Sequence, residues 1–106
     1  MVNDIRISVF FDEIKNVDDL NMVLDEIVLG DDTVIGETGI LLPYAMNEVH
    51  GDKYPGMIEF HSPMGELRLT YDEFSTLLEK RTKSFRFFTK NTQPKLDKVL
   101  NIISKW

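Results

Sequence analysis

The 106-residue sequence contains no cysteine and no long apolar run. The absence of cysteine excludes disulfide bonds, thiolate metal sites and a cysteine nucleophile. The longest unbroken apolar runs, such as Ile40 to Leu42, are far shorter than the roughly 20 residues that a membrane-spanning helix needs. The stretch from Met1 to Val9 includes Asp4 and Arg6 and therefore lacks the apolar region of a secretory signal. We expect a soluble protein of the cytoplasm.

Histidine is also scarce, and few side chains suit catalysis. His50 and His61 are the only histidines. His50, with Glu48 and Asp52, is the nearest approach to a metal or acid–base site, but zinc sites normally have three or four ligands at defined spacing. Residues 36–39 lack the lysine and the spacing of a phosphate-binding loop, and no serine has the context of a nucleophile elbow. We therefore expect no enzymatic activity, no metal and no cofactor.

Charge is unevenly distributed along the chain, whose net charge is −6. Residues 1–79 contain 17 acidic and four basic side chains, whereas residues 80–106 contain eight basic side chains and one acidic one. One interpretation is a solvated surface whose two halves partly neutralise each other after folding. The other is a recognition surface. An acidic face on a small domain suits a basic partner, and nucleic-acid-binding proteins are the commonest basic partners.

Residues 57–70 show the two-residue period of a strand pair with one buried face. Apolar Ile58, Phe60, Leu67 and Leu69 alternate with polar Glu59, His61, Glu66 and Arg68. Between the two runs, Pro63 and Gly65 are typical turn residues. The pattern predicts an antiparallel hairpin whose polar side chains point to solvent.

Two helices are predicted after this hairpin. Thr70 and Glu73 have the spacing of a capping box, and apolar residues recur at helical spacing up to Leu78, which predicts that the first helix lies across the apolar face of the hairpin. Asn91 or Thr92 can cap the second helix, with Pro94 in its first turn. The buried residues expected in this last helix are Leu96, Val99, Leu100 and Ile103.

The N-terminal segment allows two interpretations. Ile5, Ile7 and Val9 alternate as in a strand. An apolar helical stripe is the other possibility, formed by Ile7, Phe10, Phe11, Ile14 and Val17, and we favour a helix. A second helix is predicted from Asp18 or Asp19 to a C-cap at Gly30. We expect these two helices to pack antiparallel, or nearly so, because few residues join them. The overall prediction is one α+β domain over residues 1–106: two N-terminal helices, a small mainly antiparallel sheet, and two C-terminal helices.

Residues 30–56 are rich in glycine and proline, and only 33–35 and 39–42 are apolar enough for short strands. We expect most of this region to be loop, serving either as an irregular cover over the sheet or as a binding segment. If it binds a partner, acidic loop residues and nearby tyrosines are the best candidates. They are Asp31, Asp32 and Glu37 in a first loop, Glu48 and Asp52 in a second, and Tyr44 and Tyr54 as aromatic anchors.

Residues 80–90 support a different hypothesis. Five basic residues alternate there with Phe85, Phe87 and Phe88. Such a mixture can bind single-stranded nucleic acid, because aromatic rings stack on bases while cations contact phosphates. The same pattern also fits phenylalanines that pack on the core and lysines that point to solvent, which is the interpretation we favour. A nucleic-acid-binding or regulatory module is therefore the alternative, and nucleic acid is not the partner we expect.

Several segments follow one another in an order that is familiar from one family. They are Phe10–Phe11, the Asp-Asp-Leu step at 18–20, the Gly-Asp-Asp helix exit at 30–32, the strands 57–60 and 66–69, and the phrase Thr-Tyr-Asp-Glu-Phe-Ser-Thr-Leu-Leu at 70–78, followed by a short C-terminal helix. This layout resembles the immunity proteins of bacterial contact-dependent growth inhibition systems.

The resemblance implies an acidic cytosolic inhibitor without catalysis of its own. Such a protein binds the toxin domain that a neighbouring cell delivers and blocks its active site, and some members of the family neutralise tRNA-cleaving toxins. A ribonuclease must present basic side chains around its phosphate site, so an acidic surface can imitate the charge of the substrate. The expected partner is thus a cognate toxin domain, a basic nuclease, and no membrane is involved.

Overall fold

A computed structural model describes residues 4–106 of the chain. Over this range the chain forms five helices and four strands, in the α+β class that the sequence predicts. The elements in chain order are α1 (Ile5–Asp12), α2 (Val17–Leu29), β1 (Asp32–Ile35), β2 (Thr38–Leu41), α3 (Pro43–His50), β3 (Met57–Ser62), β4 (Gly65–Thr70), α4 (Tyr71–Lys83) and α5 (Gln93–Ile103).

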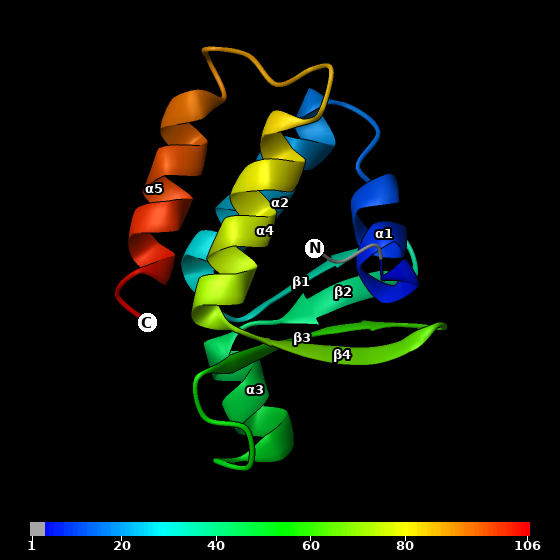
Figure 1. The fold of residues 1–106 in the computed structure, drawn as a ribbon, viewed down its shortest axis with the longest axis vertical. Coiled ribbons are helices and arrows are strands. Elements are labelled where there is room, and N and C mark those ends of the chain that lie inside the picture. Colours follow the sequence, from blue (N-terminus) through cyan, green and yellow to red (C-terminus); the bar gives the residue numbers. More distant parts are fainter. Residues whose placement is uncertain (1–3) are drawn as a thin grey trace.

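The four strands form one antiparallel sheet in the order β1-β2-β3-β4. Helices α1, α2 and α4 cover one face of this sheet, α5 packs against α2 and α4, and α3 lies on the opposite face over β2 and β3 (Figure 1). The register places Ile40, Phe60 and Leu67 side by side across β2, β3 and β4. The core therefore lies between the sheet and the larger helical layer, with Phe10, Phe60 and Phe74 among its fully buried side chains.

The predicted hairpin and the helix that follows it are confirmed. Strands β3 and β4 pair from Met57 opposite Thr70 to Ser62 opposite Gly65. The capping box is present, because Thr70 accepts a hydrogen bond from the Glu73 amide while the Glu73 side chain accepts one from the Thr70 amide. Helix α4 lies across β3 and β4 as expected.

Both N-terminal helices form, but Asn16 caps α2 in place of the predicted Asp18 or Asp19, and each helix packs mainly against elements other than its neighbour. Asp4 caps α1, Asn16 caps α2, and Gly30 ends α2 in the left-handed region with φ of 73°. Helix α1 packs chiefly on β3 and β4, whereas α2 packs on α5 and β1. The expected antiparallel pairing of the two helices with each other is therefore not the main packing relationship of either.

The interpretation of residues 30–56 as mostly loop is wrong in one segment. The short strands β1 and β2 form close to the predicted positions, but residues 43–50 form helix α3, which begins with Pro43 at its N-terminus. Ala45 and Met46 are the buried residues of this helix. Because α3 covers part of the face that was predicted to be solvated, Glu59 is only 4% exposed. The polar face of the hairpin is thus partly buried.

Candidate functional site

The seven candidate residues of the 31–54 region lie in helix, strand and connecting segments rather than in two loops. Asp31 connects α2 to β1, Asp32 begins β1, and Glu37 lies in the turn between β1 and β2. Tyr44 and Glu48 belong to α3, and Asp52 and Tyr54 belong to the connection from α3 to β3. The expectation that Asp32 and Glu48 belong to loops is therefore wrong, because Asp32 begins β1 and Glu48 is in α3.

Four of these residues are brought to one side of the molecule. The backbone amide of Leu42 donates to the carbonyl of Asp31 at 2.8 Å, and the amide of Tyr44 donates to the carbonyl of Gly30 at 2.9 Å. These bonds hold the start of α3 against the end of α2. Asp31, Asp32 and Tyr44 consequently lie around one junction, and Glu48 follows Tyr44 by one helical turn on the same face of α3.

The other three candidates lie elsewhere. Glu37 is at the opposite end of β1 from Asp32. Asp52 follows the C-terminus of α3, and an eight-residue helix is about 12 Å long, so it is separated from the Tyr44 end. Tyr54 is half-buried and stacks on the guanidinium of Arg68, whose central carbon lies 4.0 Å from the ring centroid. Tyr54 thus covers the sheet, which was the alternative role considered for it.

Exposed apolar side chains surround the acidic junction. Leu29 and Tyr44 are each 69% exposed, and Val34 is 50% exposed. The Tyr44 ring lies against Gly30, since a Cβ atom at Gly30 would be 3.4 Å from the ring. The sequence interpretation missed Leu29 and Val34. Leu29 could have been found, because it lies outside the buried stripe of α2 formed by Leu20, Val23, Leu24 and Ile27.

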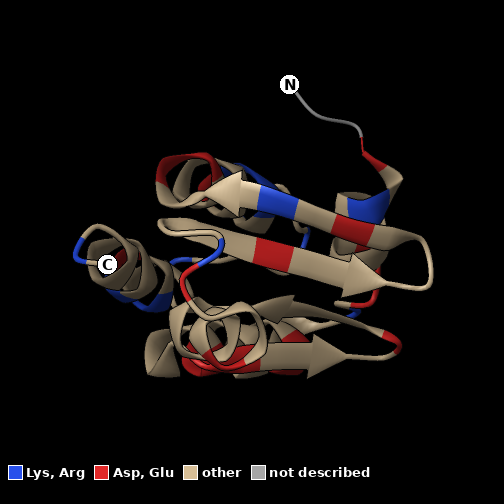
Figure 2. Cartoon of the chain, turned by 90° about the horizontal axis from the view of Figure 1, so that it is seen from below, with Lys and Arg blue, Asp and Glu red and all other residues tan. Residues whose placement is uncertain are grey.

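Charge in this part of the molecule has one sign. Residues 16–52 contain nine acidic side chains and neither lysine nor arginine. Figure 2 shows that acidic residues also occur on the β3–β4 hairpin, so what distinguishes segment 16–52 is its lack of lysine and arginine. A basic side chain that reaches this segment is Lys95 of α5, whose Nζ lies 2.6 Å from Asp25. Among residues 4–106, Asp31, Asp32 and Glu48 form no ion pair.

A cluster of polar side chains lies between α3 and the sheet, on the face of the sheet that α3 covers. The buried carboxylate of Glu59 accepts a hydrogen bond from Nη1 of Arg68 at 2.7 Å, and its Oε1 lies 3.2 Å from Nε2 of His50. The ring of Tyr54 packs edge-on against His50. Side chains from α3 and β4 therefore meet at the Glu59 carboxylate of β3, and Tyr54 of the connecting segment packs on both of them. These contacts hold α3 against the sheet.

This cluster does not reproduce the metal or acid–base site considered for Glu48, His50 and Asp52. His50 turns toward Glu59, while Glu48 and Asp52 are exposed. In the part of the chain that the structure describes, no group of three or more His, Cys, Asp or Glu side chains is arranged to hold a metal ion. The role of His50 that the geometry supports is a hydrogen-bonded contact between α3 and β3.

Several side chains of the basic segment 80–90 pack or form ion pairs within the protein, which the composition of the segment does not suggest. Phe85 and Phe87 stack on each other with centroids 4.9 Å apart, and together with Phe88 they pack against the core. The guanidinium of Arg81 lies over the Phe11 ring, 5.1 Å from its centroid. Lys83 pairs with Glu79 at 3.0 Å. Two of the three phenylalanines, Phe85 and Phe87, thus stack on each other.

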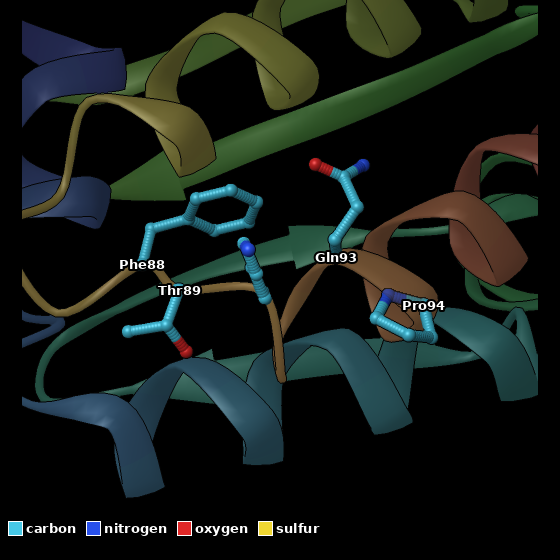
Figure 3. A pocket seen from close by; sticks show the side chains of 5 residues that line it. Phe88, Thr89, Gln93 and Pro94 are labelled. Atoms are coloured by element: carbon cyan, nitrogen blue, oxygen red, sulfur yellow. The ribbon is translucent and has the colours of Figure 1, made fainter.

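A hollow of about 440 Å³ adjoins the connection from α4 to α5. It is lined by Phe88, Thr89, Lys90, Gln93 and Pro94, and Figure 3 shows the Phe88 ring and the Gln93 amide on either side of it. Its surface is mainly apolar, with one lysine at its edge. The hollow adjoins the predicted aromatic and basic segment but uses only one of its phenylalanines.

No match to this chain was found in comparisons with protein-family models, with curated proteins and with solved structures. Among residues 4–106, every helix is too short or too polar to cross a lipid bilayer.

Proposed function

We propose that this chain is a cytoplasmic immunity-type inhibitor, which binds a secreted toxin domain of the basic nuclease class and covers its active site. A ribonuclease that cleaves tRNA is the specific target that we favour. The observation that carries the proposal is the acidic segment 16–52, which has no lysine or arginine and includes exposed carboxylates that lack an ion-pair partner among residues 4–106. The resemblance to immunity proteins described above supports the same conclusion.

The placement of the acidic residues on regular elements favours inhibition of a charged cleft. Asp32 lies on β1, an edge strand of the sheet, and Glu48 lies on α3, which packs on β2 and β3. Carboxylates on rigid elements lose less conformational freedom on binding than carboxylates on mobile loops. Complementary charge also accelerates association, so encounter with a basic nuclease should be fast and should slow as salt increases.

The alternative function, nucleic-acid binding through residues 80–90, is supported by the hollow beside Phe88 and Lys90. A base could stack on Phe88 there while Lys90 contacts a phosphate. The packing of Phe85 against Phe87 counts against this alternative, because stacking platforms need an accessible ring face. We therefore rank it second.

A binding and growth experiment tests the proposed inhibitor. The proposal predicts that the adjacent upstream reading frame encodes a large secreted protein with a short C-terminal toxin domain. This domain, purified and also co-expressed with this chain, is the probe. We expect a stable complex, loss of RNA cleavage by the domain, and restored growth of the co-expressing cells. A toxin domain that stays fully active at saturating inhibitor concentration would contradict the proposal, as would turnover of RNA by the purified chain alone.

Electrophoretic mobility of single-stranded RNA at low salt tests the alternative. The exposed residues Arg86 and Lys90 should be replaced by alanine, while Arg81 is retained because it packs on Phe11. The proposed inhibitor predicts no retention of RNA by the wild-type chain. Retention that disappears in the Arg86→Ala/Lys90→Ala variant would favour the nucleic-acid-binding module instead.

A further inference from the structure

Leu29 and Tyr44 form the centre of an exposed apolar surface, which we call the Leu29–Tyr44 patch. Leu29 is the last residue of α2, and Tyr44 is in the first turn of α3. The Tyr44 ring covers Gly30, the residue next to Leu29. Each side chain remains 69% exposed although both are large and apolar. Large apolar side chains left exposed close together and beside charged residues are typical of interaction sites in soluble proteins.

Carboxylates lie around the Leu29–Tyr44 patch on several elements. Asp31 and Asp32 follow Leu29 after Gly30, and Glu48 is one helical turn after Tyr44 on α3. All three are exposed. An apolar centre with a charged rim is the usual anatomy of a protein interface, in which central aromatic and aliphatic side chains provide most of the affinity.

The negative charge around the Leu29–Tyr44 patch indicates the kind of partner. Because Asp31, Asp32 and Glu48 have no cation paired with them among residues 4–106, a partner that presents lysine or arginine around an apolar or aromatic contact would complement both the rim and the centre. A symmetric dimer through the same patch would instead place these carboxylates opposite their own copies. The charge pattern therefore favours a basic partner over a second copy of this chain.

We infer that Leu29 and Tyr44 are the central contacts for a basic protein partner, with Asp31, Asp32 and Glu48 guiding its approach. This inference rests on the proposed function, and it assigns the inhibitory contact to the junction of α2, β1 and α3. Residues at the centre control how slowly the complex dissociates, whereas carboxylates of the rim control how fast it forms. The two groups therefore have different kinetic effects.

Association and dissociation rates with the toxin domain encoded upstream test this division. Leu29→Ser and Tyr44→Ser should each weaken binding by about 30-fold or more, chiefly through faster dissociation, as is typical of central interface residues. Asp31→Asn and Asp32→Asn should slow association several-fold and reduce its salt dependence, with little change in dissociation. Far-ultraviolet circular dichroism and melting temperature should be unchanged, because all four side chains are exposed.

Matched control substitutions are available in the β3–β4 hairpin, at the opposite edge of the sheet from β1. Met64, at the tip of the hairpin, is 57% exposed, and Met64→Ser removes a comparable apolar side chain. Glu66 lies on edge strand β4 as Asp32 lies on edge strand β1, so Glu66→Gln is the matched charge control. Both controls should bind the toxin domain within about twofold of the wild-type chain, because surface changes outside an interface have little effect.

The possible outcomes separate this inference from the proposed function. In one outcome, the wild-type chain binds and inhibits the domain while Leu29→Ser and Tyr44→Ser bind it equally well. That result would show that the patch is not the contact surface, whereas the proposed inhibitory function would still hold. If the wild-type chain does not bind the domain, the proposed function fails and the inference fails with it. Light scattering of the chain alone gives a third result: a dimer that Tyr44→Ser dissociates would show that a second copy occupies the patch, and would overturn the basic partner.

Discussion

Glu59 and Arg68 lie directly opposite each other on β3 and β4, and Nη1 of Arg68 donates to Oε1 of Glu59 at 2.7 Å. The Glu59 side chain is 5% exposed and that of Arg68 is 35% exposed. Removing the arginine therefore leaves a buried carboxylate with only His50 beside it, whereas removing the carboxylate leaves an arginine that can still reach water. Substitutions of Arg68 and of Glu59 should therefore lower the free energy of unfolding by different amounts.

We predict that Arg68→Ala lowers the free energy of unfolding by about 2–3 kcal/mol, since breaking a buried ion pair from one side is costly and partial exposure reduces that cost. Glu59→Gln keeps a hydrogen-bond acceptor in the same place and should cost about 1 kcal/mol. Urea denaturation of both single variants and of the double variant measures the coupling. Equal losses for the two single variants would contradict the assignment of Glu59 as the buried partner.

The capping box at the start of α4 is a second test. Thr70→Ala removes the acceptor for the Glu73 amide and should cost about 1 kcal/mol of unfolding free energy, as loss of an N-cap usually does. Thr76→Ala, at an exposed position within the same helix, is the control and should be neutral or slightly stabilising, because alanine is the better helix former. Thermal melts of the two variants should therefore shift differently, and a Thr76→Ala loss as large as that of Thr70→Ala would argue against the cap.

Gly39 on β2 has no room for a side chain. A Cβ atom there would lie 2.6 Å from Nε2 of His61 and 2.8 Å from the backbone carbonyl oxygen of Thr33. We predict that Gly39→Ala destabilises the protein by about 1–3 kcal/mol, the usual cost of overpacking.

The double variant Gly39→Ala/His61→Ala separates the two contacts at Gly39. Removing the imidazole relieves only one of them, and the Thr33 carbonyl belongs to the backbone, so chemical denaturation should show partial rescue relative to His61→Ala alone. Complete rescue would mean that β1 and β2 can separate without cost.

Asp4 gives the protein a dependence on acidic pH. Side-chain hydrogen bonds from Arg6, followed by the Arg6 backbone amide, lower the pKa of Asp4 from 3.8 to about 2. A group whose pKa is lower in the folded state stabilises that state above its unfolded pKa, and this contribution is lost as pH falls through the folded value. Between pH 4 and 2 the wild-type chain should therefore lose stability from this source.

Asp4→Asn tests this dependence. The variant cannot titrate at this position, so its stability should change less than that of the wild-type chain between pH 4 and 2, while it is less stable than the wild-type chain at pH 7. Melting temperatures measured across this range provide the comparison. Parallel curves for the two proteins would show that Asp4 does not contribute to the acid response.

Local patterns account for the elements that were predicted correctly. The apolar stripe of Leu20, Val23, Leu24, Ile27 and Val28 is enough to predict α2, although Val28 is only partly buried. The spacing of Thr70 and Glu73 predicts the start of α4. Helix α3 escaped prediction because its buried face consists only of Ala45 and Met46, and because Pro43 and Gly51 at its ends are also typical of loops. Its stability comes from packing on β2 and β3, which no short-range pattern reveals.

The candidate site was predicted in composition but not in arrangement. The acidic character of residues 31–52 is visible in the chain, and Asp31, Asp32, Tyr44 and Glu48 do come together. Leu29 and Val34 were not predicted as contact residues, because an apolar residue near a predicted core is normally expected to be buried. Tyr54 was selected as a possible contact, but it stacks on Arg68.

The sequence by itself determined the secondary structure near Gly30 and Thr70, the absence of cysteine chemistry, and the concentration of negative charge before residue 80. These properties depend on neighbouring residues or on composition alone. Only the tertiary structure decided that Glu59 is buried beneath α3 and that the Tyr44 ring lies against Gly30, next to the exposed Leu29. Both outcomes depend on which residues, distant in the chain, are brought together when β2 and β3 pair and α3 folds back onto them.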